Sequence, residues 1–376
     1  MEFRDLKRQY AALQPKIDAA LLAAAASGAY IMGAPVRELE ARLAAYAGVK
    51  HCLTCASGTD ALTLALKALD IGPGDAVFVP DFTFFATAET VALEGATPVF
   101  VDVRGDTFNL DAEDLEQKIS ATCKAGQVHP KAVIAVDLFG LPADYPAIRA
   151  VTDRYGLYLV EDGAQGFGGK IGDSRACSFG DISTTSFFPA KPLGCYGDGG
   201  AVFTDNEEWA ALMASYRVHG KGDSKYDNVR IGLNSRLDTL QAAILQVKLD
   251  AFEQYEWQAV QEVAERYQAQ LKGVVSTPVI PEGFRSSWAQ YTIRLRCEGK
   301  REAIRSALTA EGIPSAIYYP KPMHAQAAFA GMADADTCPV SSRLCTLVLS
   351  LPMHPYLAPE EISAVCGAIR AALEKA

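Results

Sequence analysis

The sequence has no long apolar run and no excess of positive charge. Its 376 residues contain 35 Lys and Arg against 45 Asp and Glu, a formal net charge of −10, which argues against a nucleic-acid-binding protein. No apolar stretch reaches membrane-spanning length, and the N-terminus lacks a basic region followed by an apolar core. We therefore expect a cytoplasmic protein with no membrane or nucleic-acid partner.

The sequence also lacks the spacings of common metal, redox and nucleotide sites. Cys52 and Cys55 form a single Cys-x-x-Cys among nine cysteines, with no second pair at zinc-like spacing. The pair runs into a turn, so we expect packing residues at a strand end, no metal site and no disulfide framework. The glycine-rich run Gly166–Gly172 misses the Gly-x-Gly-x-x-Gly spacing, and there is no Walker A sequence. Zinc proteins and dinucleotide-binding folds are therefore disfavoured.

Short apolar runs alternate with helical patterns along the first two thirds of the chain. Such runs predict strands of a largely parallel sheet covered by helices on both faces, an α/β architecture. Ligands then bind at the carboxyl ends of the strands. The expected strands are 77–79, 98–101, 133–137, 157–160, 183–187 and 201–203, and helices are expected at 144–155 and 207–217.

The last third of the chain predicts a smaller domain. Ser235 is a candidate N-cap of a long helix whose apolar residues recur at helical spacing. We place a large domain at residues 1–249 and a small C-terminal α+β domain at 250–376. In the small domain we expect strands at 294–296 and 347–349 and helices at 300–311 and 359–375.

Lys191 lies in an apolar run broken by turn residues, Ser186-Phe187-Phe188-Pro189-Ala190-Lys191-Pro192-Leu193-Gly194. Desolvation there lowers the pKa of the amine toward its nucleophilic form. Asp162 follows a strand-like run. A lysine that forms a Schiff base and a carboxylate that keeps the ring nitrogen protonated are what pyridoxal 5′-phosphate (PLP) requires. Taken singly, the lysine also fits a surface loop and the aspartate a helix cap.

A third segment predicts a phosphate site. In Cys55-Ala56-Ser57-Gly58-Thr59-Asp60, small and hydroxyl residues precede a strong helix-forming run. The free N–H groups and the positive end of such a helix bind a phosphate dianion. Ser186 could add a hydroxyl. An ordinary Ser N-cap explains this segment equally well when it is taken alone.

Together these segments resemble the DegT/DnrJ/EryC1/StrS sugar aminotransferase family, a branch of the fold-type I PLP enzymes. The resemblance covers nearly the whole chain. It rests on Ala56-Ser57-Gly58-Thr59, Phe82-Thr83-Phe84, Glu161-Asp162-Gly163-Ala164-Gln165, the Lys191 segment and Gly232-Leu233-Asn234-Ser235-Arg236-Leu237. Within the family, the Lys191 segment and Asn-Ser-Arg-Leu-Asp-Thr-Leu-Gln look most like the UDP-2-acetamido-2-deoxy-3-oxo-glucuronate 3-aminotransferases.

The resemblance implies a role for each candidate residue. Lys191 and Asp162 would be catalytic. Asn234 would reach the phosphate of the neighbouring subunit's cofactor, which implies a homodimer with shared active sites. Arg236 would bind a substrate carboxylate, for which a guanidinium fork is suited. The remaining cofactor contacts would be Ser57, Gly58, Thr59, Phe84 (stacked on the ring), Gln165 (on the 3-oxygen) and Ser186, and the substrate segment would contribute Tyr318, Tyr319 and His324.

The implied activity is transfer of an amino group from glutamate to a nucleotide-linked keto sugar. The cofactor would alternate between PLP and pyridoxamine phosphate, and Lys191 would serve as both base and acid. We expect the acceptor to be C3 of a UDP-linked 3-keto-2-acetamido uronic acid, for lipopolysaccharide or another surface polysaccharide. Two alternatives stay open: a 4-aminotransferase for a 4-keto-6-deoxy sugar, and a non-catalytic PLP-binding regulatory protein.

Overall fold

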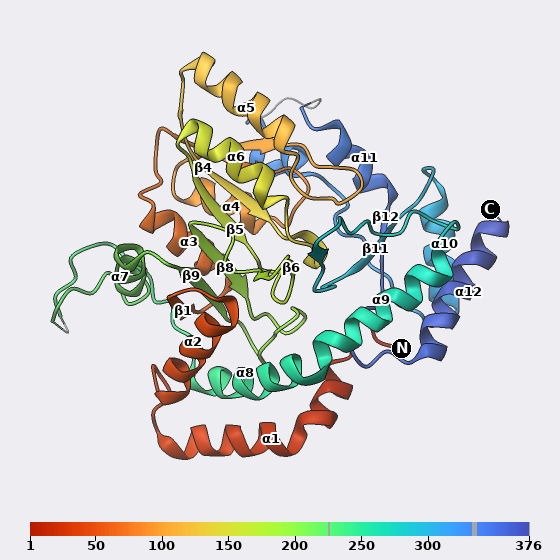
Figure 1. Ribbon diagram of the computed structural model, residues 1–376, viewed down its shortest axis with the longest axis horizontal. Coiled ribbons are helices and arrows are strands. Elements are labelled where there is room, and N and C mark those ends of the chain that lie inside the picture. Colours follow the sequence, from red (N-terminus) through yellow and green to blue (C-terminus); the bar gives the residue numbers. More distant parts are fainter. Residues whose placement is uncertain (225, 333–336, 376) are drawn as a thin grey trace.

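A seven-stranded sheet lies at the centre of the protein (Figure 1). The computed structural model describes residues 1–224, 226–332 and 337–375. The strands of the sheet are β1 (His51–Cys55), β2 (Asp75–Pro80), β3 (Thr97–Val101), β4 (His129–Val136), β5 (Tyr158–Asp162), β8 (Ile182–Ser186) and β9 (Gly200–Thr204). Their order is β1-β9-β8-β5-β4-β2-β3.

The sheet is mostly parallel, which confirms the predicted fold class. Strands β3, β2, β4, β5 and β8 run parallel to one another. The exception is β9, which pairs antiparallel with both β8 and β1. All six predicted strands of this sheet are present within a few residues of their expected bounds. For the edge strand β1 no bounds were predicted, but the expectation that Cys52 and Cys55 pack at a strand end agrees with its position.

Alternate residues of each strand pack on opposite faces of the sheet. Val77 and Val79 of β2 join one apolar cluster, whereas Phe78 between them joins another. The first cluster includes α3, α4 and α7, the second includes α5 and α6, and a third cluster places α2 and α8 over β9. These helices are α2 (Ala34–Ala47), α3 (Gly58–Ala68), α4 (Ala86–Leu93), α5 (Ala112–Ala125), α6 (Tyr145–Tyr155), α7 (Glu207–Tyr216) and α8 (Thr239–Ala251).

One long helical stretch joins the sheet to a second apolar core. Helix α8 continues through a π-helical turn (Phe252–Glu256) into α9 (Trp257–Leu271). The second core lies to the right in Figure 1 and contains α9, α10 (Lys300–Ala310), α12 (Pro359–Lys375), β11 (Tyr291–Arg294) and β12 (Val348–Leu351). It lies in the region predicted as the small domain, and the boundary at residue 250 stays a prediction.

Two local expectations are wrong. Ser235 does not cap the long helix, because α8 begins at Thr239 with Asp238 as its N-cap. The Ser235 hydroxyl instead accepts a hydrogen bond from the Ala56 N–H at 3.1 Å. The strand expected at 294–296 is β11, which ends at Arg294 after pairing with β12. In both cases a partner distant in sequence decides the local structure.

The remaining elements lie around this frame. Helix α1 (Leu6–Ser27) packs on α8 through Leu13 and Ile17, at the bottom of Figure 1. A small sheet has the order β10-β6-β7, and α11 precedes β12. Of the helices in the described ranges, none is both long and apolar enough to cross a membrane. The bounds of these elements are β6 Lys170–Ile171, β7 Ser174–Arg175, β10 Phe284–Arg285 and α11 Pro339–Leu347.

Candidate active site

A cavity of about 640 Å³ opens at the carboxyl ends of the parallel strands. Its wall includes the last residues of β5 and β8 and the turn that precedes α3. This is where ligands bind in sheets of this kind. Ten of the predicted site residues line it: Ser57, Gly58, Thr59, Phe84, Asp162, Gln165, Ser186, Lys191, Tyr318 and Tyr319.

Asp162 is a buried carboxylate held in a fixed orientation. One oxygen accepts a hydrogen bond from the Thr87 hydroxyl at 2.9 Å, and the other accepts from the Ala164 N–H at 3.2 Å. Burial raises the pKa of Asp162, while Thr87, Ala164 and the Lys191 ammonium oppose that rise. A buried acceptor that is not saturated by its own neighbours is suited to a cationic donor in the cavity.

Lys191 lies on a tight turn after β8. Its N–H donates to the Phe188 carbonyl at 2.8 Å. Burial lowers the pKa of the Lys191 amine; the Asp162 carboxylate counteracts this shift and the Arg4 guanidinium adds to it. The shift favours the neutral amine, which is the nucleophilic form.

The N-terminus of α3 closes one end of the cavity. The Ser57 hydroxyl caps the helix by accepting from the Asp60 N–H at 3.0 Å. Gly58 is required here because a Cβ on it would lie 2.7 Å from Cβ of Ser186. The first-turn N–H groups of an α-helix lack partners within the helix, so this corner can bind a phosphate.

Gln165 and two aromatic residues form another part of the wall. The Gln165 Oε1 atom accepts from the Phe139 N–H at 2.9 Å, and its Nε2 donates to the Tyr319 hydroxyl at 3.2 Å. Phe84 leaves 55% of its surface exposed and its ring centroid lies 6.5 Å from that of Tyr319. An aromatic face open to a cavity can stack on a planar ring.

Two predicted residues lie elsewhere in the single chain. Asn234 and Arg236 do not line this cavity in the described part of the protein. Asn234 is exposed, and its side-chain oxygen accepts from the Arg236 guanidinium at 2.5 Å. Both follow an arm formed by residues 218–224 and 226–233, which projects beyond α7 at the left of Figure 1.

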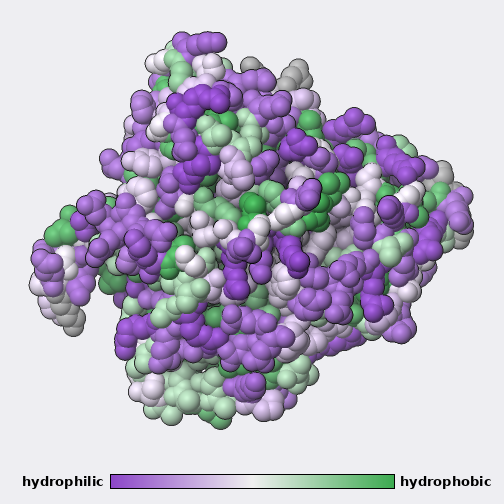
Figure 2. Space-filling model, in the orientation of Figure 1, coloured by the Kyte–Doolittle hydropathy of each residue, from purple (hydrophilic) through white to green (hydrophobic). Residues whose placement is uncertain are grey.

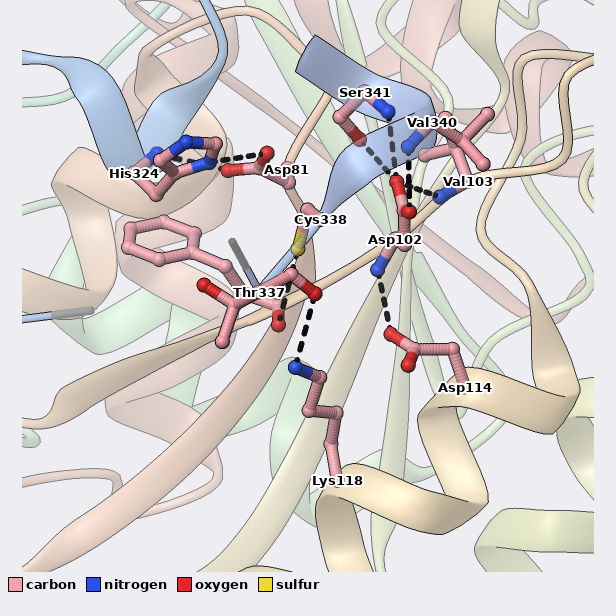
Figure 3. Close-up of polar contacts among 11 residues, drawn as sticks. Asp81, Asp102, Val103, Asp114, Lys118, His324, Thr337, Cys338, Val340 and Ser341 are labelled. Atoms are coloured by element: carbon pink, nitrogen blue, oxygen red, sulfur yellow. Dashed lines mark hydrogen bonds and ion pairs between the residues drawn. The ribbon is translucent and has the colours of Figure 1, made fainter. Parts of the chain in front are cut away.

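His324 also lies outside the cavity lining, and Figure 3 shows its ring directed at Asp81. The Nδ1 atom lies 2.7 Å from one oxygen of the Asp81 carboxylate, and the His324 N–H donates to the other at 2.8 Å. Asp81 is fully buried and directly follows β2. The adjacent residues Met323 and Gln326 do line the cavity. The imidazole therefore holds the segment that carries them.

A second aspartate, Asp102, holds the start of α11 in a similar way. Asp102 directly follows β3, and its carboxylate accepts from the N–H groups of Val340 and Ser341 at the start of α11 (Figure 3). The Ser341 hydroxyl donates to it as well, at 2.7 Å. Asp81 and Asp102 thus tie His324 and the start of α11 to neighbouring strands of the sheet.

The structure adds residues that the sequence patterns did not indicate. Thr87 orients Asp162, and the Arg4 guanidinium donates to the Lys191 carbonyl at 2.8 Å. Asp198, Gln290 and Lys321 line the cavity. The Tyr-Tyr-Pro-Lys-Pro context could have indicated Lys321, but Arg4 is 187 residues from the carbonyl that it contacts.

Comparisons with known proteins converge on one group. Residues 12–370 match the family model described as the DegT/DnrJ/EryC1/StrS aminotransferase family. The chain is 46% identical over 370 residues to the UDP-2-acetamido-2-deoxy-3-oxo-D-glucuronate aminotransferase of Pseudomonas aeruginosa, covering 98% of this chain and 99% of that protein. It is 43% identical to the UDP-N-acetyl-3-dehydro-alpha-D-glucosamine 3-aminotransferase of Acidithiobacillus ferrooxidans, covering 98% and 97%.

Solved structures agree with these matches. A DegT DnrJ EryC1 StrS aminotransferase from Brucella abortus superposes with a TM-score of 0.96 at 50% identity, covering 99% of both chains. NtdA from Bacillus subtilis, solved with bound pyridoxamine phosphate, superposes with a TM-score of 0.86 at 29% identity, covering 96% of this chain and 82% of that one.

Proposed function

The chain belongs to the DegT/DnrJ/EryC1/StrS family of PLP-dependent aminotransferases, and we propose that it aminates C3 of a UDP-linked 3-keto-2-acetamido uronic acid. Glutamate is the proposed amino donor, and the proposed use of the product is in lipopolysaccharide or another surface polysaccharide. The observation that carries the proposal is the convergence of Lys191, Asp162 and the N-terminus of α3 on one cavity.

The residues present fit PLP. When bound, this cofactor supplies an electron sink that stabilises negative charge on the carbon that loses its proton. The N-terminus of α3 and the Ser186 hydroxyl would hold its phosphate. Asp162 would keep the proton on the ring nitrogen. The Lys191 amine would hold the aldehyde covalently and then carry the proton between the substrate carbon and the cofactor.

The choice of a uronic acid rests on two observations. A relative that shares 46% of its residues over nearly the whole chain is named for such a substrate. Arg236 offers a partly exposed guanidinium whose fork matches a carboxylate. The second relative, at 43% identity, is named for a 3-keto sugar without the acid, which supports position C3.

A homodimer with shared sites is the proposed assembly. Asn234 and Arg236 do not line the cavity of their own chain and are at least partly exposed, so a neighbouring copy can reach them. Val229 and Ile231 in the arm are 54% and 90% exposed, and the surface over α1 is pale green in Figure 2 where most of the view is purple. Exposed apolar surface of this kind is typical of an interface between subunits.

Absorbance and product analysis test the reaction. The purified protein should show a PLP absorbance band that is lost when glutamate is added. Amino-sugar nucleotides offered with 2-oxoglutarate then identify the sugar in the reverse direction. We expect the UDP-3-amino-2-acetamido uronic acid to react fastest. Faster reaction of a 4-amino-6-deoxy sugar would select the 4-aminotransferase, and PLP binding without any turnover would select the regulatory alternative.

Complementation between two inactive variants tests the shared site. Lys191→Ala and the double variant Asn234→Ala/Arg236→Ala should each be nearly inactive alone. After mixing and subunit exchange, the heterodimer should contain one intact site. We expect roughly a quarter of the wild-type activity from statistical pairing of two subunits. No recovery, in a mixture shown to contain heterodimers, would contradict sharing.

A further inference from the structure

Arg4 reaches the main chain of the lysine turn from the other end of the sequence. Its Nη2 atom donates to the Lys191 carbonyl at 2.8 Å and to the Pro192 carbonyl at 3.3 Å. It lies just before α1, outside the cavity lining. Arg8, one turn later, is half exposed and pairs with the surface carboxylate of Glu361. The two arginines therefore have different environments.

The environment of Arg4 keeps a positive charge behind the turn. Burial lowers the pKa of Arg4 to about 10, and the carboxylate of Glu256 opposes this shift. Glu256 is itself held in place by Gln9, at 2.9 Å, and by the Tyr356 hydroxyl, at 2.6 Å. A group with that pKa remains protonated at neutral pH.

Two other basic groups interact electrostatically with Arg4, and the pKa of each is lowered. Burial lowers the pKa of Lys248 to about 8, with Arg4 contributing. Burial likewise lowers the pKa of His354 to about 4, again with a contribution from Arg4. Of these three groups, Arg4 keeps the highest pKa.

Two charged groups face the amine of Lys191 itself. The Asp162 carboxylate favours its protonated form and the Arg4 guanidinium disfavours it. Arg4 also donates a hydrogen bond to the carbonyl of Lys191. One side chain therefore affects both the protonation of the Lys191 amine and the orientation of its turn.

We propose that Arg4 is a positioning residue for Lys191, which orients the turn through two carbonyls and places a permanent positive charge next to it. The proposal rests on the proposed function, in which Lys191 holds PLP. Arg4 touches neither cofactor nor substrate in this arrangement; it acts through the lysine.

The test separates charge from geometry in the PLP-loaded enzyme. Absorbance is recorded against pH for the wild type, Arg4→Gln, Arg4→Lys and the matched surface control Arg8→Gln, together with kcat, KM for glutamate and thermal unfolding. The absorbance reports protonation of the nitrogen that joins Lys191 to the cofactor. A nearby cation disfavours that proton, so its removal should raise the midpoint.

We expect Arg4→Gln to raise the midpoint by roughly 0.5 to 1.5 pH units and to lower kcat, with KM for glutamate little changed. Arg4→Lys should shift the midpoint less than Arg4→Gln does, because an ammonium keeps charge at this position, but it should lose roughly fivefold in kcat, because it cannot grip both carbonyls in the same geometry. Arg8→Gln should match the wild type in both readouts.

Other outcomes would overturn the proposal. An Arg4→Gln enzyme with a wild-type midpoint would remove the electrostatic role, and wild-type kcat in Arg4→Lys would remove the positioning role. The lysine variant keeps the test valid if the glutamine variant does not fold. A wild type that shows no PLP absorbance would instead contradict the proposed function.

Discussion

The two walls of the cavity are held in different ways. The sheet wall, comprising Ser57, Asp162, Ser186 and Lys191, comes from strand ends and turns of the central sheet. The segment wall, residues 318–326, lies between strands of the second core and is tied to the sheet through Asp81. The sheet wall is formed by the central sheet itself. The segment wall packs against the sheet and is held there by side-chain contacts, such as those of His324 and Met323.

The two walls would therefore have different roles, the sheet wall in proton transfer and the segment wall in recognition of the sugar. The groups that would carry out proton transfer are buried and directed by contacts with their immediate surroundings, as Asp162 is by Thr87. The groups that would meet the sugar include the exposed Lys321 and, from a neighbouring chain, Arg236. Substitutions of exposed residues in the segment wall, such as Lys321, can change the substrate without disturbing the packing of the sheet, because exposed loop positions tolerate change better than core elements.

The largest expected effect comes from the sheet wall. Lys191→Ala should lower transamination by at least roughly 10⁴-fold, because it removes both the covalent anchor and the proton carrier. The fold should persist, since the turn is held by main-chain contacts. Turnover and circular dichroism check this, with Lys67→Ala, which breaks only the ion pair with Glu94, as the matched control. Near-normal turnover would contradict the assignment of Lys191.

Asp162→Asn should give the next largest loss. An amide cannot keep the ring nitrogen charged, so we expect PLP to bind while the rate falls by roughly 10²-fold or more. Thr87→Val, which removes a hydrogen-bond donor from the same carboxylate, should cost roughly fivefold. Rate constants for the glutamate half-reaction separate these cases. A wild-type rate in Asp162→Asn would leave Asp162 with a structural role only.

Arg236→Ala should affect one class of substrate. Loss of a charge-assisted contact worth about 2–3 kcal/mol should lower kcat/KM for a uronic acid sugar by roughly 30- to 150-fold. A neutral 6-deoxy sugar should be little affected. Arg236→Lys, which keeps the charge without the fork, should lie between the two. Equal losses of kcat/KM on the two sugars would mean that Arg236 does not bind the carboxylate.

Asp81→Asn tests the attachment of the segment wall and should give the smallest effect. We expect a loss of roughly three- to tenfold in the sugar half-reaction, with the glutamate half-reaction unchanged. A double variant with His324→Gln should be no worse than either single variant, because both remove the same contact. A loss shared equally by the two half-reactions would contradict the separation of the walls.

The sequence patterns predict the sheet wall well. Continuous apolar runs mark buried strands, and polar residues at their ends, such as Asp162 and Ser186, mark the edge where a ligand binds. The antiparallel direction of β9 could not be predicted, because the apolar pattern of a buried strand is the same in either direction. The bounds of β1 (His51–Cys55) were not predicted, because the polar residues His51 and Thr54 interrupt its apolar pattern.

Contacts between distant segments explain what could not be predicted. Ser235 looked like a helix cap, but its hydroxyl is bound to the Ala56 N–H, 179 residues away. Arg4 carries no local pattern, and its contact with Lys191 exists only in the folded chain. His324 was predicted as a substrate contact because it lies in the substrate segment. Its pairing with Asp81 could not be predicted, because it depends on how that segment meets the end of β2 in the folded chain.

The position of β9 in the sheet bears on the order in which the protein can be assembled during synthesis. Among the described strands, β1 is hydrogen-bonded to β9 alone. The turn that carries Ser57 follows β1 directly, so its position in the sheet depends in part on residues 200–204, which are synthesised much later. Shorter nascent chains should be unable to capture the cofactor. Cofactor binding would then indicate that the seven-stranded sheet is complete. The bound cofactor would also stabilise the pairing of β1 with β9, the first and last strands of this sheet in chain order.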